Sequence, residues 1–93
     1  MSRAFQFGKA VKELRIHLCQ NSSSSSGVRQ FIEKHYVDFK NLNKTTPILI
    51  REASNVQPKL YARYEFGKEA HLPLTNMNES QVLSALEKLA KNN

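Results

Sequence analysis

The chain has 93 residues, which is enough for one small domain and too few for separate cofactor and substrate domains. Its hydrophobic fraction of 40% and charged fraction of 24% exclude a disordered or fibrous protein. Fourteen Lys and Arg against eight Asp and Glu give a net charge of +6, which favours acidic partners such as nucleic acid, an anionic membrane surface or an acidic protein. Because no three of these bases adjoin, a solvated basic surface explains the charge better than a nucleic-acid site.

The single cysteine, Cys19, excludes an intramolecular disulfide and a thiolate-rich zinc site. No apolar run approaches the roughly 20 residues of a membrane-spanning helix, so no transmembrane segment is predicted. The first twelve residues contain three bases and no acid, a composition that fits organelle import. We therefore expect an intracellular, mitochondrial protein with a basic N-terminal extension over residues 1–11 and a single domain over residues 12–93.

Residues 12–19 are predicted to form a strand, because apolar and polar residues alternate there. One face carries Leu14, Ile16 and Leu18, and the other carries Arg15, His17 and Cys19. The first face is therefore expected to be buried and the second exposed. The serine-rich stretch 21–27 that follows is typical of a flexible loop.

A helix is predicted over residues 28–40, because apolar residues recur there at helical spacing. These residues are Val28, Phe31, Ile32, Tyr36 and Phe39. The side chain of Ser25 or Ser26 is expected to cap the first turn. Opposite charges four residues apart favour the same helix, and the pairs are Arg29–Glu33 and Lys34–Asp38.

Three further strands are predicted over residues 48–51, 59–66 and 70–74. A strand, a helix and a strand in succession form a unit whose two strands must be parallel. Pro73 cannot donate a ladder hydrogen bond, so the last strand is expected at an edge of the sheet. A final helix is predicted after Asn78, which forms a capping box with Gln81.

The order β-α-β-β-β-α predicts an α/β fold with a four-stranded mixed sheet and both helices packed mainly on one face. This is the outline of a thioredoxin-like domain in which the middle helix is reduced to a loop. In that fold a cis proline immediately precedes the third strand, and Gln57-Pro58 stands at that place. Pro58 is therefore a candidate cis proline, against the general preference of such bonds for trans.

A thiol site of the thioredoxin kind is the nearest chemistry that the residues offer. Cys19-Gln20-Asn21-Ser22 matches a C-x-x-S pattern, but the serine-rich loop separates it from the helix whose dipole would stabilise a thiolate. His17 and Cys19 alone do not make a metal site, and the three glycines are too isolated for a phosphate-binding loop. We therefore predict no catalytic residue, no metal site, no disulfide and no cofactor.

Two parts of the chain resemble a known family. The first comprises Leu14-Arg15-Ile16-His17-Leu18-Cys19-Gln20 and Gly27-Val28-Arg29-Gln30-Phe31-Ile32-Glu33-Lys34. The second comprises Pro47-Ile48-Leu49-Ile50-Arg51-Glu52, Val56-Gln57-Pro58-Lys59-Leu60 and Ala62-Arg63-Tyr64 with Gly67. They are similar to the small accessory subunit of mitochondrial NADH:ubiquinone oxidoreductase (respiratory complex I) known as alpha subcomplex subunit 2. The resemblance spans roughly residues 12–89, and mitochondrial ribosomal proteins with the same domain type resemble the chain much less.

The resemblance implies a non-catalytic subunit in the matrix arm of complex I, on the matrix side of the inner membrane. Such a subunit would bind no flavin, iron–sulfur cluster or quinone, and would support assembly and stability of the complex that passes electrons from NADH to ubiquinone. Its partners would be other subunits of that arm, with no direct contact to nucleic acid. Animal members of the family often have a second cysteine where this chain has Ala53, so no thiol pair with Cys19 can form.

The face of the sheet left uncovered by the helices is the expected docking surface, together with the loop over residues 51–58. The candidate interface residues are Arg15, His17, Arg51, Glu52, Gln57, Tyr61 and Arg63. Because Arg forms planar paired hydrogen bonds with carboxylates, we expect an acidic neighbour. Three alternatives remain open, namely a merely solvated face, a ribosome- or RNA-associated protein of the same fold, and a monothiol redox protein.

Overall fold

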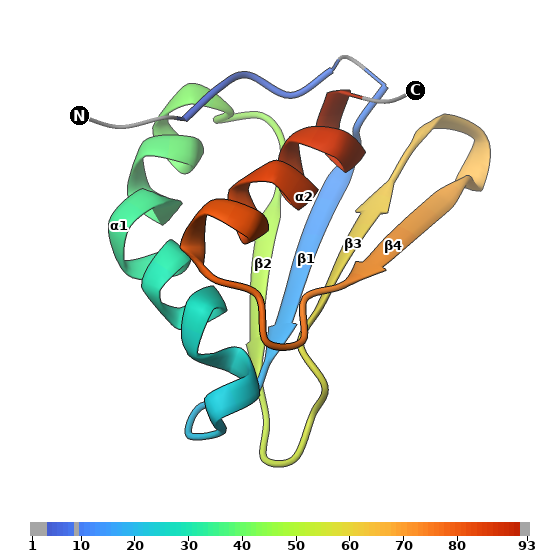
Figure 1. Cartoon of the computed structure of the whole chain (residues 1–93). Coiled ribbons are helices and arrows are strands. Elements are labelled where there is room, and N and C mark those ends of the chain that lie inside the picture. Colours follow the sequence, from blue (N-terminus) through green and yellow to red (C-terminus); the bar gives the residue numbers. More distant parts are fainter. Residues whose placement is uncertain (1–3, 9, 92–93) are drawn as a thin grey trace.

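The computed structural model describes residues 4–8 and 10–91. Within them, a four-stranded sheet lies against two helices (Figure 1). The elements in chain order are β1 (Glu13–Leu18), the short 3-10 turn η1 (Ser23–Ser25), α1 (Ser26–Leu42), β2 (Ile48–Glu52), β3 (Lys59–Arg63), the 3-10 turn η2 (Glu65–Gly67), β4 (Glu69–Pro73) and α2 (Glu79–Lys91). Residues 1–3 and 9 of the expected extension, and residues 92–93 of the expected domain, lie outside the described residues.

The sheet has the strand order β2-β1-β3-β4. β1 is parallel to β2 and antiparallel to β3, and β3 is antiparallel to β4. The predicted α/β layout with a mixed sheet is therefore confirmed, and so is the edge position of the strand that contains Pro73. The thioredoxin-like assignment itself stays a prediction.

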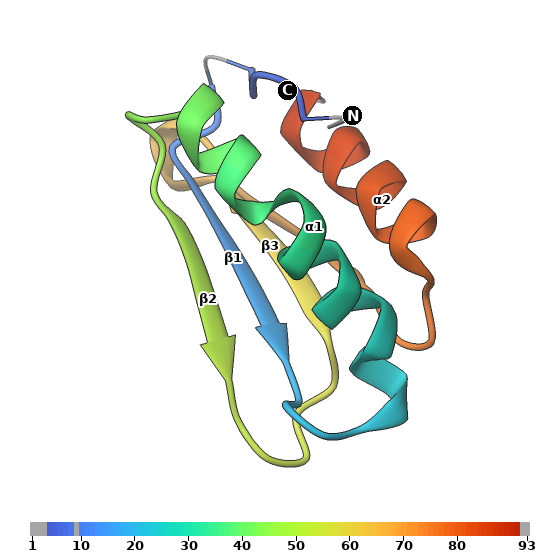
Figure 2. The same ribbon diagram turned by 90° about the vertical axis from the view of Figure 1, so that its left-hand side faces the viewer.

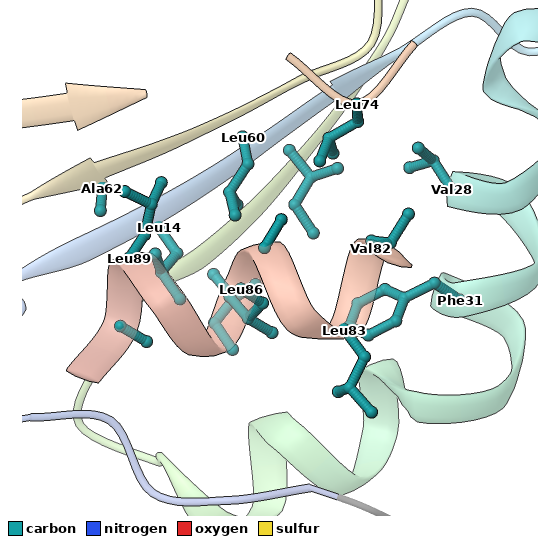
Figure 3. Close-up of a cluster of buried hydrophobic side chains, with 14 of the residues drawn as sticks. Leu14, Val28, Phe31, Leu60, Ala62, Leu74, Val82, Leu83, Leu86 and Leu89 are labelled. Atoms are coloured by element: carbon teal, nitrogen blue, oxygen red, sulfur yellow. The ribbon is translucent and has the colours of Figure 1, made fainter. Parts of the chain in front are cut away.

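Both helices cover the same face of the sheet, as expected (Figure 2). The alternation in β1 buries Leu14, Ile16 and Leu18, each at most 3% exposed, against these helices. Side chains of the sheet and of α2 point toward one another in the resulting core, and Val28 and Phe31 of α1 close it from the side (Figure 3). Because most of the apolar surface is buried on this side, the opposite face of the sheet is left for polar residues.

The start of α2 forms as the capping box predicts. The backbone N–H of Asn78 donates to the side chain of Gln81, and the backbone N–H of Gln81 donates to the side chain of Asn78, both at 2.9 Å. The start of α1 differs from the prediction, because the hydroxyl of Ser25 makes no bond to the first turn. It accepts the backbone N–H of Cys19 at 3.0 Å instead, and so ties the serine-rich loop to the end of β1.

The predicted charge pairs along α1 are not among the salt bridges of the described residues, because tertiary partners replace them. Lys34 pairs with Glu79 at 3.0 Å, and the ring Nε2 of His35 lies 2.7 Å from the same carboxylate. Arg29 donates to two carbonyl oxygens of the serine-rich loop, those of Cys19 and Ser22. Contacts between elements thus take precedence over contacts within the helix.

The prediction of a cis bond before Pro58 is wrong, since the described residues contain no cis peptide bond. The trans form is favoured by about 0.5–1 kcal/mol in the absence of other constraints. The carbonyl of Pro58 accepts the backbone N–H of Leu74 at 2.9 Å, so the strand pairing extends to this residue with the trans bond in place.

The hairpin between β3 and β4 begins earlier than predicted. The expected strand over residues 59–66 ends at Arg63, and residues 65–67 form η2 instead. Phe66 has φ of 62° and is 93% exposed, so it neither continues the strand nor joins the buried face. The next strand begins one residue before the predicted start, at Glu69, which leaves the buried Leu74 just beyond its end.

The described part of the expected N-terminal extension packs on the domain. The ring of Phe39 in α1 contacts Phe5 edge-on at 5.0 Å and stacks on Phe7 at 5.7 Å between ring centroids. Asn43, which is buried, accepts the backbone N–H of Phe7 and donates to the carbonyl of Phe5. Apolar residues of this segment therefore complete the core at one end of α1.

Candidate functional site: the open face of the sheet

The side of the sheet away from both helices (Figure 2) is here named the open face. The burial pattern of the strands places most of the candidate interface on it. Side chains alternate along a strand, so the residues between the buried ones point to this side. They are Glu13, Arg15 and His17 of β1, Leu49 and Arg51 of β2, Lys59, Tyr61 and Arg63 of β3, and Glu69, His71 and Pro73 of β4. The strand register sorts them into three rows that cross the sheet and differ in chemistry.

The first row, at the start of β1, contains charges that are paired within the protein. Glu13 lies opposite Arg63, which in turn lies opposite Glu69. The carboxylate of Glu13 accepts a hydrogen bond from Nε of Arg15, and its other oxygen lies 3.7 Å from Arg63. The hydrogen bond from Arg15 lowers the pKa of the Glu13 carboxyl, and the positive charges of both arginines act in the same direction. These two arginines are therefore partly neutralised before any partner binds.

Three rings form a group in the middle of the open face. Tyr61 and His71 come from the second row, and His17 comes from the third. The centroid of the Tyr61 ring lies 4.8 Å from that of His17 and 5.6 Å from that of His71. Burial lowers the pKa of His17, and the nearby positive charges of Arg15, Arg51 and Lys59 lower it further. Its imidazole is therefore mainly neutral at physiological pH. The rings form a partly apolar patch in the middle of the face.

The third row has two cations and no acid. Arg51 of β2 and Lys59 of β3 lie on either side of His17. Neither has an ion pair within residues 4–8 and 10–91. The positive charges of both residues contribute to lowering the pKa of His17. An acidic group from outside the chain would meet the least competition at this end of the open face.

Five of the predicted interface residues do lie on the open face, namely Arg15, His17, Arg51, Tyr61 and Arg63. Glu52 does not, because it is in register with the buried Leu18 and lines a groove on the helix side of the sheet. Gln57 lies in the exposed loop between β2 and β3, where its side-chain oxygen accepts a hydrogen bond from Thr75. The part that these seven residues play in binding remains a prediction.

Lys59 and His71 belong to the same face, although neither was among the predicted interface residues. The alternation in β3 could have indicated Lys59, because it is two residues from Tyr61. No such signal was present for His71, which joins the ring group only because the hairpin places it opposite Tyr61.

The position of Cys19 differs from the expected one. It follows the last residue of β1 and is 2% exposed, so its thiol is not part of the open face. The thiol donates to Oδ1 of Asn21 at 3.2 Å. Hydrogen bonds from the backbone of Asn21 and of Asn55 lower its pKa, with a smaller contribution from the positive charge of Arg29. Cys19 is thus a buried thiol with a pKa below that of an ordinary cysteine.

The described part of the chain has neither a cluster of metal ligands nor a helix that could span a membrane. No group of three or more His, Cys, Asp and Glu residues in residues 4–8 and 10–91 is placed to hold a metal ion. In the same residues, neither helix has the length and apolar character needed to cross a membrane.

Known proteins share both the domain and nearly the full length of this chain. Residues 28–79 match the family described as mitochondrial ribosomal protein L51 / S25 / CI-B8 domain. NADH dehydrogenase (ubiquinone) 1 alpha subcomplex subunit 2 of Arabidopsis thaliana is 53% identical over 83 residues, which are 89% of this chain and 86% of the relative. The mouse protein of the same name is 48% identical over 86 residues, 92% of this chain and 87% of the relative. The chain belongs to the alpha subcomplex subunit 2 family.

Two further relatives, one fungal and one ribosomal, are less similar to this chain. The NADH-ubiquinone oxidoreductase 10.5 kDa subunit of Neurospora crassa is 43% identical over 93 residues, which are 100% of this chain and 99% of the relative. The mouse large ribosomal subunit protein mL43 is only 22% identical over 85 residues, and these residues are 91% of this chain but 46% of that protein. The similarity is therefore much stronger to the alpha subcomplex subunit 2 family.

Proposed function

We propose that this protein is a non-catalytic accessory subunit of mitochondrial complex I, bound in the matrix arm. The observation that carries the proposal is the identity of 43–53% to relatives from a plant, a mouse and a fungus, each named as a subunit of this oxidoreductase and matched over at least 86% of its length. The proposal assigns the chain no cofactor and no step in electron transfer. Its contribution is to bind neighbouring subunits and to support the assembly and stability of the complex.

The open face is the proposed docking surface. Of its two ends, the one with Arg51 and Lys59 is better suited to bind an acidic partner. Arg51 and Lys59 lack an acidic partner among the described residues, whereas Arg15 and Arg63 share Glu13. A carboxylate from a neighbouring subunit would therefore gain more at the first pair. The ring of Tyr61 beside this pair adds the kind of amphipathic contact area that is enriched in protein interfaces.

For each of the two alternative functions, one observation is in favour and another is against. The domain family includes ribosomal proteins, but RNA recognition on a sheet uses several exposed aromatic rings, and the open face has one tyrosine that is already packed between two imidazoles. The lowered pKa of Cys19 favours a monothiol redox protein. The burial of that thiol, in a chain with one cysteine, argues against reaction with a large substrate.

To test the proposed function, a tagged copy of the chain is expressed in cells that lack their own copy of this subunit. Mild detergent extracts of these cells are then resolved by native electrophoresis. The tag is expected to migrate with NADH dehydrogenase activity. Migration with a ribosomal subunit would contradict the proposal, and release of the tag from that band by ribonuclease would establish the ribosomal alternative.

The docking surface is tested by charge reversal in the same system. Arg51→Glu together with Lys59→Glu should reduce incorporation into the complex by at least about tenfold, because each buried like-charge contact costs several kcal/mol. The control is Lys40→Glu with Lys88→Glu, which makes the same change of charge at exposed positions of the two helices. Circular dichroism of the isolated chains checks that all are folded. Equal incorporation of both double variants would contradict the assignment of the open face.

A further inference from the structure

The two edges of the sheet differ in how well they are protected from pairing with another strand. Proteins commonly block an edge with proline, charged residues or a covering element. The edge strand β4 begins with Glu69 and ends with Pro73. The edge strand β2 has no proline, and Ile48, Leu49 and Ile50 make up more than half of its five residues. Within residues 4–8 and 10–91, no element runs along the outer side of β2 (Figure 2).

The backbone of β2 has hydrogen-bonding groups directed away from the sheet. The carbonyl of Pro47 accepts from Leu14, and the N–H of Ala53 donates to Leu18, so odd-numbered residues of this segment face β1. In a parallel ladder the residues alternate between the two sides. Ile48, Ile50 and Glu52 therefore direct their N–H and C=O groups outward, at the spacing that an added strand requires.

A groove accompanies this edge on the helix side. It has a volume of about 450 Å³ and lies between β2 and α1. Leu18, Ile32 and Ile50 supply its apolar lining, and Arg29, Glu33 and Glu52 supply polar groups. An apolar side chain that points to this side from an added strand would be removed from water in the groove.

The other side of the same edge is basic. Leu49 is 39% exposed on the open face, and Arg51 follows it two residues later. Arg51 continues into the row that contains His17 and Lys59, and neither Arg51 nor Lys59 has an ion pair among the described residues. A carboxylate on this side of an added strand would be attracted to Arg51.

We propose that the edge of β2 binds an extended segment of a neighbouring protein subunit, which joins the sheet as a fifth strand. Alternate residues of this segment are apolar toward the groove beside α1 and acidic toward Arg51, because the two sides of the edge differ in that way. The backbone bonds go to Ile48, Ile50 and Glu52. The inference rests on the proposed function, since the partner is a subunit of the complex into which the chain is built.

The test removes outward-facing N–H groups without changing those that bond to β1. Ile50→Pro and Glu52→Pro each delete one such group from the edge of β2. The matched control is Glu69→Pro at the other edge. This change has the same chemistry, and it also removes an outward N–H, because the bonds of Leu74 to Pro58 and of Tyr64 to Lys68 place odd-numbered residues of β4 on its outer side. Lys68, before it, already has the extended conformation that a following proline requires.

Incorporation into the complex is measured for each variant by native electrophoresis, with the wild-type chain as the reference. We expect incorporation of Ile50→Pro and of Glu52→Pro to be at least tenfold lower than that of the wild-type chain. Incorporation of Glu69→Pro is expected to stay within twofold of wild type. If the wild-type chain is absent from the complex, the proposed function fails. If it is present and Glu52→Pro incorporates as well as Glu69→Pro, the edge proposal is overturned, whether or not Ile50→Pro folds. A wild-type chain that forms dimers in solution and loses them in Glu52→Pro would also overturn it, because the edge would then bind a second copy.

Discussion

Neighbouring residues of β1 point to opposite faces of the sheet and are held in different ways. Leu14 is 1% exposed and belongs to the buried core, so many contacts depend on it (Figure 3). Arg15, next to it, lies on the open face and is held by one carboxylate, that of Glu13. The face that the helices cover therefore determines whether the chain folds, whereas the open face can change its chemistry with little effect on the fold. This freedom is what a docking surface requires.

The largest effect is expected when a leucine is replaced by alanine on each of the two faces and the losses in stability are compared. Leu14→Ala should lower the free energy of unfolding by about 2–5 kcal/mol, because it leaves a cavity in the core. Leu49→Ala, on the open face opposite Arg15, should lower it by less than about 1 kcal/mol, because Leu49 is already 39% exposed. Urea unfolding of both variants measures the difference. Similar losses would show that the open face also contributes to stability, and would contradict the contrast drawn between the faces.

A smaller effect is expected from pH, and it concerns the open face. The pKa of His17 is lowered in the folded chain, so between that pKa and the ordinary value near 6.5 the unfolded chain binds more protons. Stability should therefore rise with pH across this window and be lost progressively as pH falls below about 6.5. His17→Gln should make the unfolding free energy less dependent on pH between about 5 and 7, because its amide does not titrate. An unchanged pH profile in this variant would show that His17 is not held in the neutral form.

Most of the fold follows from residue patterns that act over short distances. The alternation of Leu14, Ile16 and Leu18 predicts the strand and its buried face, and the Asn78–Gln81 pair predicts the start of α2. Both features depend on neighbours within a few residues in the chain, so the sequence displays them directly.

The features that the sequence analysis missed depend on residues far apart in the chain. Arg29 was expected to pair with Glu33, but it binds carbonyls of the serine-rich loop, which folds back over the start of α1. The row of Arg51, His17 and Lys59 comes from three strands, so only the register brings these three residues together. Spacing along one segment cannot predict a site of this kind, whereas the strand order and register can.

The smallest effect is expected at Cys19, which follows the last residue of β1. Its thiol is buried and donates to Asn21, and a serine hydroxyl can make the same bond in nearly the same volume. The chain has no second cysteine to form a disulfide. We therefore expect Cys19→Ser to leave incorporation into complex I and NADH oxidation within the error of wild type. Ser25→Ala is the control for the local structure, because it removes the acceptor for the backbone N–H of Cys19 and leaves the thiol in place. A large loss of NADH oxidation in Cys19→Ser but not in Ser25→Ala, with both variants incorporated, would show that the thiol itself is required and would favour the redox alternative.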